Sequence, residues 1–273
     1  MASLSATILS ESALAAAWAS LRKRGRTALI PYLTAGHPDR VRSLGAIQAA
    51  AEHADLIEVG VAFSDPLADG PTIQASSFEA LQRGMTLPRT LELVAEARLR
   101  IPVILFTYLN PVLRYGLPRF LRDAAAAGAA GLLVSDLPAG GDAAVEEAVR
   151  QSPLDLIRLV APTTTGPRLR AVAEGAEGFL YLVARLGVTG ASASLADDLP
   201  AYISRVRAAS SLPLALGFGI STPQQAAAAA RLADGVVVGS ALVDRLAREG
   251  PSGAARMLAD LRHAIDQVDR SQS

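Results

Sequence analysis

Two acidic residues are the strongest candidates for catalysis in this sequence. Glu58 lies inside the apolar segment 55–61, and Asp69 follows it in a stretch rich in Asp, Pro and Gly. A carboxylate in a buried strand must be protonated, paired or used in chemistry, because an unpaired buried charge is costly or shifts its pKa. One acid near a strand end and a second on the next loop favour general acid–base chemistry in an α/β barrel.

Structural roles stay open for both acids. A structural Glu58 would bond buried backbone or a tyrosine, and Asp69 followed by glycine also matches an ordinary turn. Side chains alternate along a strand, so Glu58 faces the barrel interior if Ile57 and Val59 face the helices. Its side chain then lies near the C-terminal mouth, where barrel enzymes have their active sites.

Glycine-rich turns follow three apolar segments in the second half of the chain. They span residues 185–190, 216–221 and 238–241. Glycines let an anion approach backbone N–H groups, and a helix N-terminus adds a favourable partial charge. A phosphate site after strands seven and eight is a recurrent barrel feature, so the turns predict a phosphorylated ligand, although glycine also ends strands for steric reasons.

The elements that must position these residues alternate regularly. Strands are predicted at residues 28–33, 56–61, 103–108, 131–135, 156–161, 179–184, 213–217 and 235–238. Helices are predicted at 40–53, 90–99, 118–127, 142–151, 167–174, 197–209, 223–231 and 252–268, after an amphipathic helix within 10–24 that carries Leu14, Trp18 and Leu21 on one face. Eight strand–helix units over about 250 residues predict a (β/α)₈ TIM barrel. We interpret residues 1–273 as one domain, with 1–26 as an N-terminal helical extension.

Composition excludes several classes of function. Lys plus Arg and Asp plus Glu number 26 each, which gives no basic surplus for nucleic acid and no polybasic tail for a membrane. The chain has no cysteine, so disulfides, thiolate nucleophiles and zinc–cysteine sites are excluded. No segment has the pattern of a secretory signal or a membrane span, and a soluble cytoplasmic protein is expected. The basic run 22–26 is interpreted as a solvated helix end.

Other chemistries find less support. The first predicted strand runs into residues 31–38 without G-x-G-x-x-G, which lowers the case for an open dinucleotide-binding sheet. His37, His53 and His263 lack metal-ligand spacing, and no metal site is predicted. No lysine lies within a predicted strand, so a Schiff-base aldolase is disfavoured. By spacing alone, Tyr181 is as compatible with the core as with ligand contact.

Several motifs together resemble one enzyme family. The run EVGVAFSDPLADGPT (58–72) closely resembles the signature of the tryptophan synthase alpha chain. Further matching motifs are PYLTAG (31–36), YLNP (108–111), SDLP (135–138), APTT (161–164), GVTG (187–190), GFGI (217–220) and GS (239–240). The resemblance covers residues 14–265, nearly the whole chain.

The resemblance implies a TIM barrel with an extra N-terminal helix and a retro-aldol lyase activity. Enzymes of this family cleave indole-3-glycerol phosphate to indole and glyceraldehyde 3-phosphate, without a metal or organic cofactor. The indole passes to a pyridoxal-phosphate-dependent beta chain in an αββα heterotetramer. No nucleic acid or membrane partner is implied.

The resemblance also implies site residues. Glu58 matches the general acid–base that protonates indole C3 and takes up the glycerol hydroxyl proton, and Asp69 matches the acid that bonds the indole N–H. Thr189 matches a partner that closes over Asp69, and Tyr181 matches a residue beside the reacting centre. The phosphate cradle is matched by Gly190, Phe218, Gly219, Gly239 and Ser240. The apolar positions around the indole are matched by Phe106, Leu133 and Val237, and Tyr32 is counted with these substrate-binding residues.

Two departures from the family pattern stand out. Ala62 lies where the family usually has proline, near the beta-chain contact, and Ala184 lies where it usually has serine. Neither replaces an acid, but Ala62 puts the strength of beta-chain coupling in question. Three alternatives remain open: a stand-alone lyase that releases free indole, a barrel that is only an allosteric subunit, and another phosphate-binding barrel of histidine or tryptophan biosynthesis. The two acids argue against the second, and the 58–72 run argues against the third.

Overall fold

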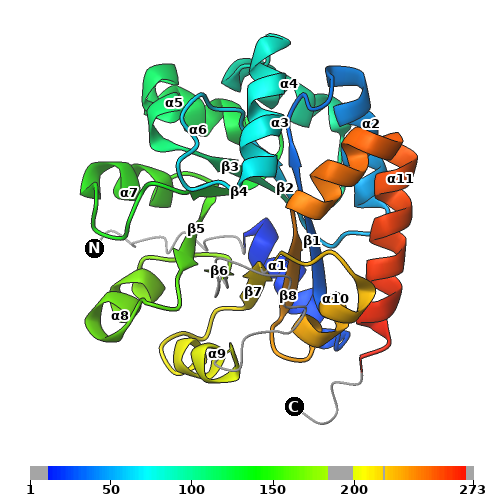
Figure 1. Cartoon of the computed structure of the whole chain (residues 1–273). Coiled ribbons are helices and arrows are strands. Elements are labelled where there is room, and N and C mark those ends of the chain that lie inside the picture. Colours follow the sequence, from blue (N-terminus) through cyan, green and yellow to red (C-terminus); the bar gives the residue numbers. More distant parts are fainter. Residues whose placement is uncertain (1–11, 184–198, 218, 269–273) are drawn as a thin grey trace, which may run out of the picture.

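Eight parallel strands close into a barrel in the computed structural model, which describes residues 12–183, 199–217 and 219–268. The strands pair in chain order, and β8 closes the barrel against β1 (Figure 1). Their bounds are β1 Ala28–Thr34, β2 Ile57–Gly60, β3 Val103–Thr107, β4 Ala129–Val134, β5 Asp155–Val160, β6 Leu180–Val183, β7 Leu214–Gly217 and β8 Gly235–Val238. All eight predicted strands are present, and the predicted TIM barrel is confirmed.

Helices surround the barrel on its outer face (Figure 1). Their bounds are α1 Ala13–Lys23, α2 Arg40–Ala51, α3 Pro71–Gln82, α4 Leu87–Ala97, α5 Leu109–Tyr115, α6 Leu117–Ala126, α7 Ala143–Arg150, α8 Gly166–Glu174, α9 Leu199–Arg207, α10 Pro223–Ala230 and α11 Ser240–Asp266. In the part of the chain that the structure describes, no helix combines the length and apolar character that a membrane crossing requires.

Three helical segments differ from the sequence predictions. α3 and α5 had no predicted counterpart, because α3 buries small and polar residues such as Ser76 and Ser77, and α5 is a short element. The last helix, predicted at 252–268, matches the second half of α11, whereas its first half, which starts at Ser240, was not predicted. A kink separates the two halves of α11, where Gly250 has a φ of 69° and Pro251 lacks a backbone N–H.

The core has two layers. Ile57 and Val59 belong to the layer between barrel and helices, whereas Leu56 belongs to the cluster inside the barrel. This arrangement confirms the predicted alternation along β2 and directs Glu58 inward. α1 adds Leu14 and Trp18 to the interior cluster, at the end of the barrel where the strands begin. The N-terminal helix therefore closes the bottom of the barrel and leaves the opposite end for the site.

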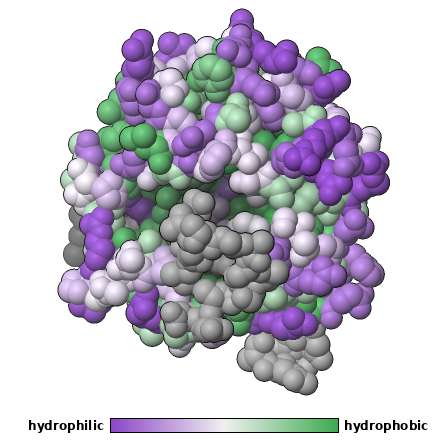
Figure 2. Space-filling view, viewed as in Figure 1, coloured by the Kyte–Doolittle hydropathy of each residue, from purple (hydrophilic) through white to green (hydrophobic). Residues whose placement is uncertain are grey.

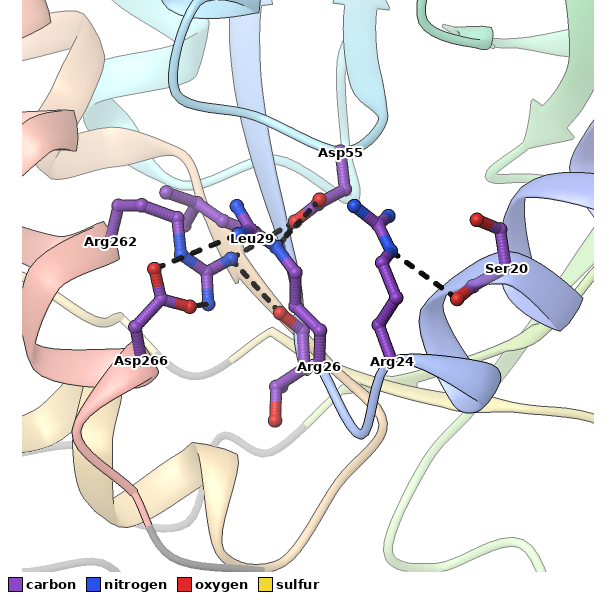
Figure 3. A network of polar contacts seen from close by, with 8 residues as sticks. Ser20, Arg24, Arg26, Leu29, Asp55, Arg262 and Asp266 are labelled. Carbon is purple, nitrogen blue, oxygen red and sulfur yellow. Dashed lines mark hydrogen bonds and ion pairs between the residues drawn. The ribbon is translucent and has the colours of Figure 1, made fainter.

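An ionic network joins the N-terminal segment to the last helix (Figure 3). Arg26 Nε and Arg262 Nη1 each lie 3.0 Å from a different oxygen of Asp55, and the Leu29 N–H donates to Asp55 Oδ2. Arg262 also contacts Asp266 on its own helix. Residues 22–24 are exposed, as expected for a solvated helix end, but Arg26 is not merely solvated: it joins the network that holds β1 and α11 together.

Candidate active site

Glu58 occupies a dry position inside the barrel. It lies on β2, in register with Tyr32 on β1 and Ile104 on β3, and its exposed fraction is 0%. Neither carboxyl oxygen has a hydrogen-bond partner among the described residues. Burial raises the pKa of Glu58 from its ordinary value of 4.5 to about 8, because the ionised form loses its hydration.

The contacts of Glu58 disfavour a structural role. A carboxyl group that stabilised the fold would bond buried backbone or a tyrosine hydroxyl, and none of the described groups bonds it. Buried polar groups in folded proteins are nearly always paired, so an unpaired one calls for an explanation, of which a catalytic role is one. Glu58 is therefore a protonated acid at neutral pH, held where a ligand could use it.

Two tyrosines lie at the same level of the barrel as Glu58. The Tyr32 hydroxyl packs against Gly60, and the Tyr181 hydroxyl packs against Gly217. A Cβ atom added to Gly60 would lie 2.0 Å from the Tyr32 hydroxyl oxygen, and one added to Gly217 would lie 2.5 Å from the Tyr181 hydroxyl oxygen. Burial raises the pKa of both tyrosines, and the charges of Glu58 and Asp69 raise it further. Both hydroxyls are therefore neutral, and both acids act electrostatically on the same space.

Asp69 lies in the loop between β2 and α3. Its backbone N–H donates to the Pro66 carbonyl at 3.0 Å, and Gln74 Nε2 donates to its carbonyl at 2.9 Å. The side chain is partly buried. Burial raises its pKa to about 6, while a hydrogen bond from the Tyr108 hydroxyl partly offsets that rise. Asp69 is thus ionised at neutral pH while Glu58 keeps its proton.

Apolar side chains line the barrel interior beside Glu58. Leu133 and Val237 are buried members of the interior cluster, and Phe106 packs partly buried against it. The rings of Phe106 and Tyr32 meet edge to face with centroids 5.5 Å apart. Figure 2 shows one face of the molecule hollowed at its centre, where apolar side chains are visible inside a more polar surrounding surface. A flat apolar ligand suits such walls.

The ends of β7 and β8 supply backbone groups for an anion. These strands are neighbours, with Gly217 opposite Val237, so the turns that follow them meet at one side of the mouth. Gly219 has a φ of 51° and open space around its Cα, and Gly239 caps α11 without a side-chain hydrogen bond. Ser240 is the exposed first residue of that helix. The free N–H groups at this helix N-terminus favour an anion.

Not every predicted residue can be placed. Thr189, Gly190 and Phe218 lie outside the described residues, as does Ala184. Sequence reasoning also missed a participant: Tyr108 was part of a matching motif but received no role, although its position at the end of a strand could have suggested one. Within the described segments, no group of three or more His, Asp or Glu residues could hold a metal ion.

The fold and site together define a (β/α)₈ barrel of the kind found in enzymes, with a protonated acid inside it, an ionised acid on a loop at its mouth and glycine-rich turns after its last two strands. Comparisons make the class specific. A family model described as "Tryptophan synthase alpha chain" matches residues 18–271. Proteins of that name from Citrifermentans bemidjiense and Acidiphilium cryptum are 52% and 50% identical over 229 and 240 residues, which are 83% and 86% of this chain and 86% and 87% of theirs.

Solved structures agree with the sequence relatives. Tryptophan synthase subunit alpha from Legionella pneumophila has a TM-score of 0.85 at 34% identity, with 94% of this chain and 99% of that chain covered. A chain of Mycobacterium tuberculosis tryptophan synthase has a TM-score of 0.84 at 41% identity, with 93% and 98% covered. The chain belongs to the tryptophan synthase alpha chain family.

Proposed function

We propose that this chain cleaves indole-3-glycerol phosphate to indole and glyceraldehyde 3-phosphate, the alpha reaction of tryptophan synthase. The observation that carries the proposal is Glu58, a buried carboxyl group that none of the described residues bonds and whose pKa rises to about 8. Family membership supplies the substrate and places the reaction in tryptophan biosynthesis, with the cytoplasm as the expected location.

The reaction needs one group that first gives and then takes a proton. In the proposed mechanism, Glu58 donates its proton to indole C3, and the resulting carboxylate accepts the proton of the glycerol hydroxyl next to the breaking bond. The C–C bond then breaks, its electron pair restores the indole ring, and the hydroxyl carbon becomes the aldehyde. A carboxyl group with a pKa near neutrality suits both steps.

Asp69 has the complementary task. Protonation at C3 places positive charge on the indole nitrogen, and an ionised carboxylate that accepts the N–H stabilises that charge. Its pKa of about 6 leaves it ionised when Glu58 is still protonated. Phe106, Leu133 and Val237 surround the ring in this proposal, with Tyr32 and Tyr181 beside the reacting centre.

The phosphate group binds far from the breaking bond and contributes binding energy that positions the substrate. Backbone N–H groups of Gly219, Gly239 and Ser240 form the cradle, supported by the free N-terminus of α11. Thr189, Gly190 and Phe218 complete the binding residues, on the strength of the family motifs alone. No step of the proposed mechanism calls for a metal or organic cofactor.

The proposed partner is a tryptophan synthase beta chain, in an αββα assembly that receives the indole. The loop carrying Asp69 also presents Leu67, which is 92% exposed. Ala62, where the family usually has proline, is buried against Ala80 and Met85 instead. We therefore expect Ala62 to influence beta-chain coupling through the conformation of its loop and not through direct contact.

The test is indole release from indole-3-glycerol phosphate by the purified chain, alone and with a beta chain. We expect weak release that rises with the beta chain, and loss of release in Glu58→Gln and in Asp69→Asn. Glu92→Gln, an exposed position on α4, is the matched control and should leave release unchanged. High release that the beta chain does not alter would favour the stand-alone lyase, and no release in either condition would refute the proposal.

A pH profile sharpens this test. In substrate-free enzyme, kcat/KM should fall below about pH 6 as Asp69 takes up a proton, and above about pH 8 as Glu58 loses its own. Asp69→Asn should remove the acid limb from any residual activity. A flat profile between pH 5 and 9 would contradict the two assignments.

A further inference from the structure

Gln74 lies in the first turn of α3, directly after the loop that carries Asp69. The helix begins at Pro71, and its N-cap, Gly70, has no side chain that could bond the first turn. The Gln74 backbone N–H donates to the Gly70 carbonyl at 3.0 Å, as in a regular helix. The backbone of Gln74 is therefore fixed at the start of α3, next to the loop.

The side-chain amide of Gln74 bonds the loop at two points. Nε2 donates to the Asp69 carbonyl at 2.9 Å and to the Pro66 carbonyl at 3.4 Å. The same Pro66 carbonyl accepts the Asp69 N–H at 3.0 Å, which closes a turn over residues 66–69. A primary amide carries two N–H donors, so it can serve both carbonyls at once. Gln74 thus braces the turn that ends at the second acid.

The tip of this turn is exposed, at Leu67 and Ala68. The Leu67 N–H donates to the Asp65 carbonyl within the same loop, and the Ala68 N–H donates to the Tyr108 hydroxyl at 3.0 Å. The bond to Tyr108 connects the tip of the turn to the end of β3, whereas the two bonds from Gln74 connect its ends to α3. Segments with few buried contacts open most readily, so these bonds largely decide where the turn lies.

α3 is a firm support for the turn. On its buried face the Ser76 hydroxyl lies 2.7 Å from the Thr34 hydroxyl of β1, and each of these residues is 1% exposed. Ile73 packs in one apolar cluster with Tyr32 of the same strand. β1 is the neighbour of β2, and Tyr32 is in register with Glu58. A continuous set of contacts therefore runs from the strand pair that holds Glu58, through α3, to the turn.

We propose that Gln74 is a positioning residue for the lyase reaction, because its side-chain amide holds the turn over residues 66–69 on α3 and so fixes Asp69 relative to Glu58. Gln74 acts through the backbone of Asp69 and not on the reacting atoms. The inference rests on the proposed function for the task of the Asp69 carboxylate. The hydrogen bonds from Gln74 exist without substrate, so they can be tested separately.

Two substitutions separate hydrogen-bond donation from shape. Gln74→Met keeps the length of the side chain but removes both N–H donors. Gln74→Glu also keeps the planar end group, but an ionised carboxylate can only accept hydrogen bonds and would repel the two carbonyl oxygens. Because Gln74 is exposed, water can solvate the released carbonyls and the fold should persist. Both variants should lose activity, and Gln74→Glu should lose at least as much as Gln74→Met.

The experiment measures indole release by these variants at saturating beta chain, beside Gln82→Met and Gln82→Glu. Gln82 is a matched control, because it is the exposed last residue of the same helix. For the Gln74 variants we expect kcat to fall about tenfold, because a small misplacement of Asp69 weakens its stabilisation of charge in the transition state. KM should change less, since the proposed phosphate cradle is untouched. The controls should keep the wild-type kcat and KM.

A second readout does not depend on catalysis. Hydrogen–deuterium exchange of the Ala68 and Asp69 amides in the substrate-free chain should be about tenfold faster in Gln74→Met than in wild type or Gln82→Met, because the turn opens more often. Equal exchange rates would overturn the proposal, as would a wild-type kcat in either Gln74 variant. A wild-type chain that releases no indole would refute the lyase function, while the exchange rates would still decide whether Gln74 holds the turn.

Discussion

Replacement of Glu58 by glutamine should stabilise the protein at alkaline pH. The folded chain holds this carboxyl group at a pKa of about 8, against 4.5 for an ordinary glutamate. One pKa unit corresponds to about 1.4 kcal/mol, so the full shift lowers the free energy of unfolding by on the order of 5 kcal/mol once both states are ionised. The amide that replaces the carboxyl group in Glu58→Gln is neutral at every pH and escapes this cost.

The raised pKa of Glu58 lowers the stability of the folded protein over a defined range of pH. Below about pH 4.5 Glu58 is protonated in the folded and the unfolded chain, so it gives no pH-dependent penalty there. Between about pH 4.5 and 8 Glu58 ionises only in the unfolded chain, so the wild-type protein loses stability as pH rises. Above about pH 8 both states are ionised, and the difference from Glu58→Gln reaches a plateau.

Urea unfolding followed by circular dichroism measures this difference at each pH from 5 to 9. The stability of Glu58→Gln relative to wild type should increase by about 1.4 kcal/mol per pH unit up to pH 8. Glu92→Gln, at an exposed position, should follow wild type at every pH within about 0.5 kcal/mol. A constant difference between Glu58→Gln and wild type across this range would show that Glu58 is not held protonated, and the assignment of the acid would fail with it.

Three further substitutions test the frame around the site. Trp18→Ala should destabilise the chain by about 3–5 kcal/mol in thermal unfolding, because it opens a cavity at the bottom of the barrel. Arg262→Ala should cost about 3 kcal/mol in urea unfolding, since it leaves the nearly buried Asp55 with one arginine fewer. Gly60→Ala should cost about 1–3 kcal/mol in urea unfolding and lower kcat/KM, because its Cβ would lie 2.0 Å from the Tyr32 hydroxyl oxygen. Unchanged stability in any of the three would contradict the packing described for that residue.

The barrel itself was largely predictable because its signals are local. Each strand is a short apolar segment, and the alternation of side chains along β2 correctly assigned Ile57 and Val59 to the outer layer and directed Glu58 inward. The helix predicted from residue 223 likewise starts there as α10, where Thr222 accepts a hydrogen bond from the Gln225 N–H.

The elements that the sequence did not predict depend on packing between distant segments. α3 contains Ser76, whose hydroxyl lies 2.7 Å from the Thr34 hydroxyl on β1. The face of α3 that packs against the barrel therefore carries a polar residue, where a periodic pattern would show an apolar one. The first half of α11 precedes a glycine and a proline that ordinarily end a helix, and the pattern alone therefore placed the start after them. In both cases tertiary contacts outweigh the periodic signal.

The roles of the two acids could not be read from their types, because both are carboxylates in one motif. Their surroundings separate them: Glu58 has no partner among the described groups and titrates near pH 8, whereas Asp69 receives a hydrogen bond and titrates near pH 6. In the interval between these values one acid can donate a proton while the other carries charge. The chemistry proposed for the site therefore depends on a difference in surroundings that only the folded barrel creates.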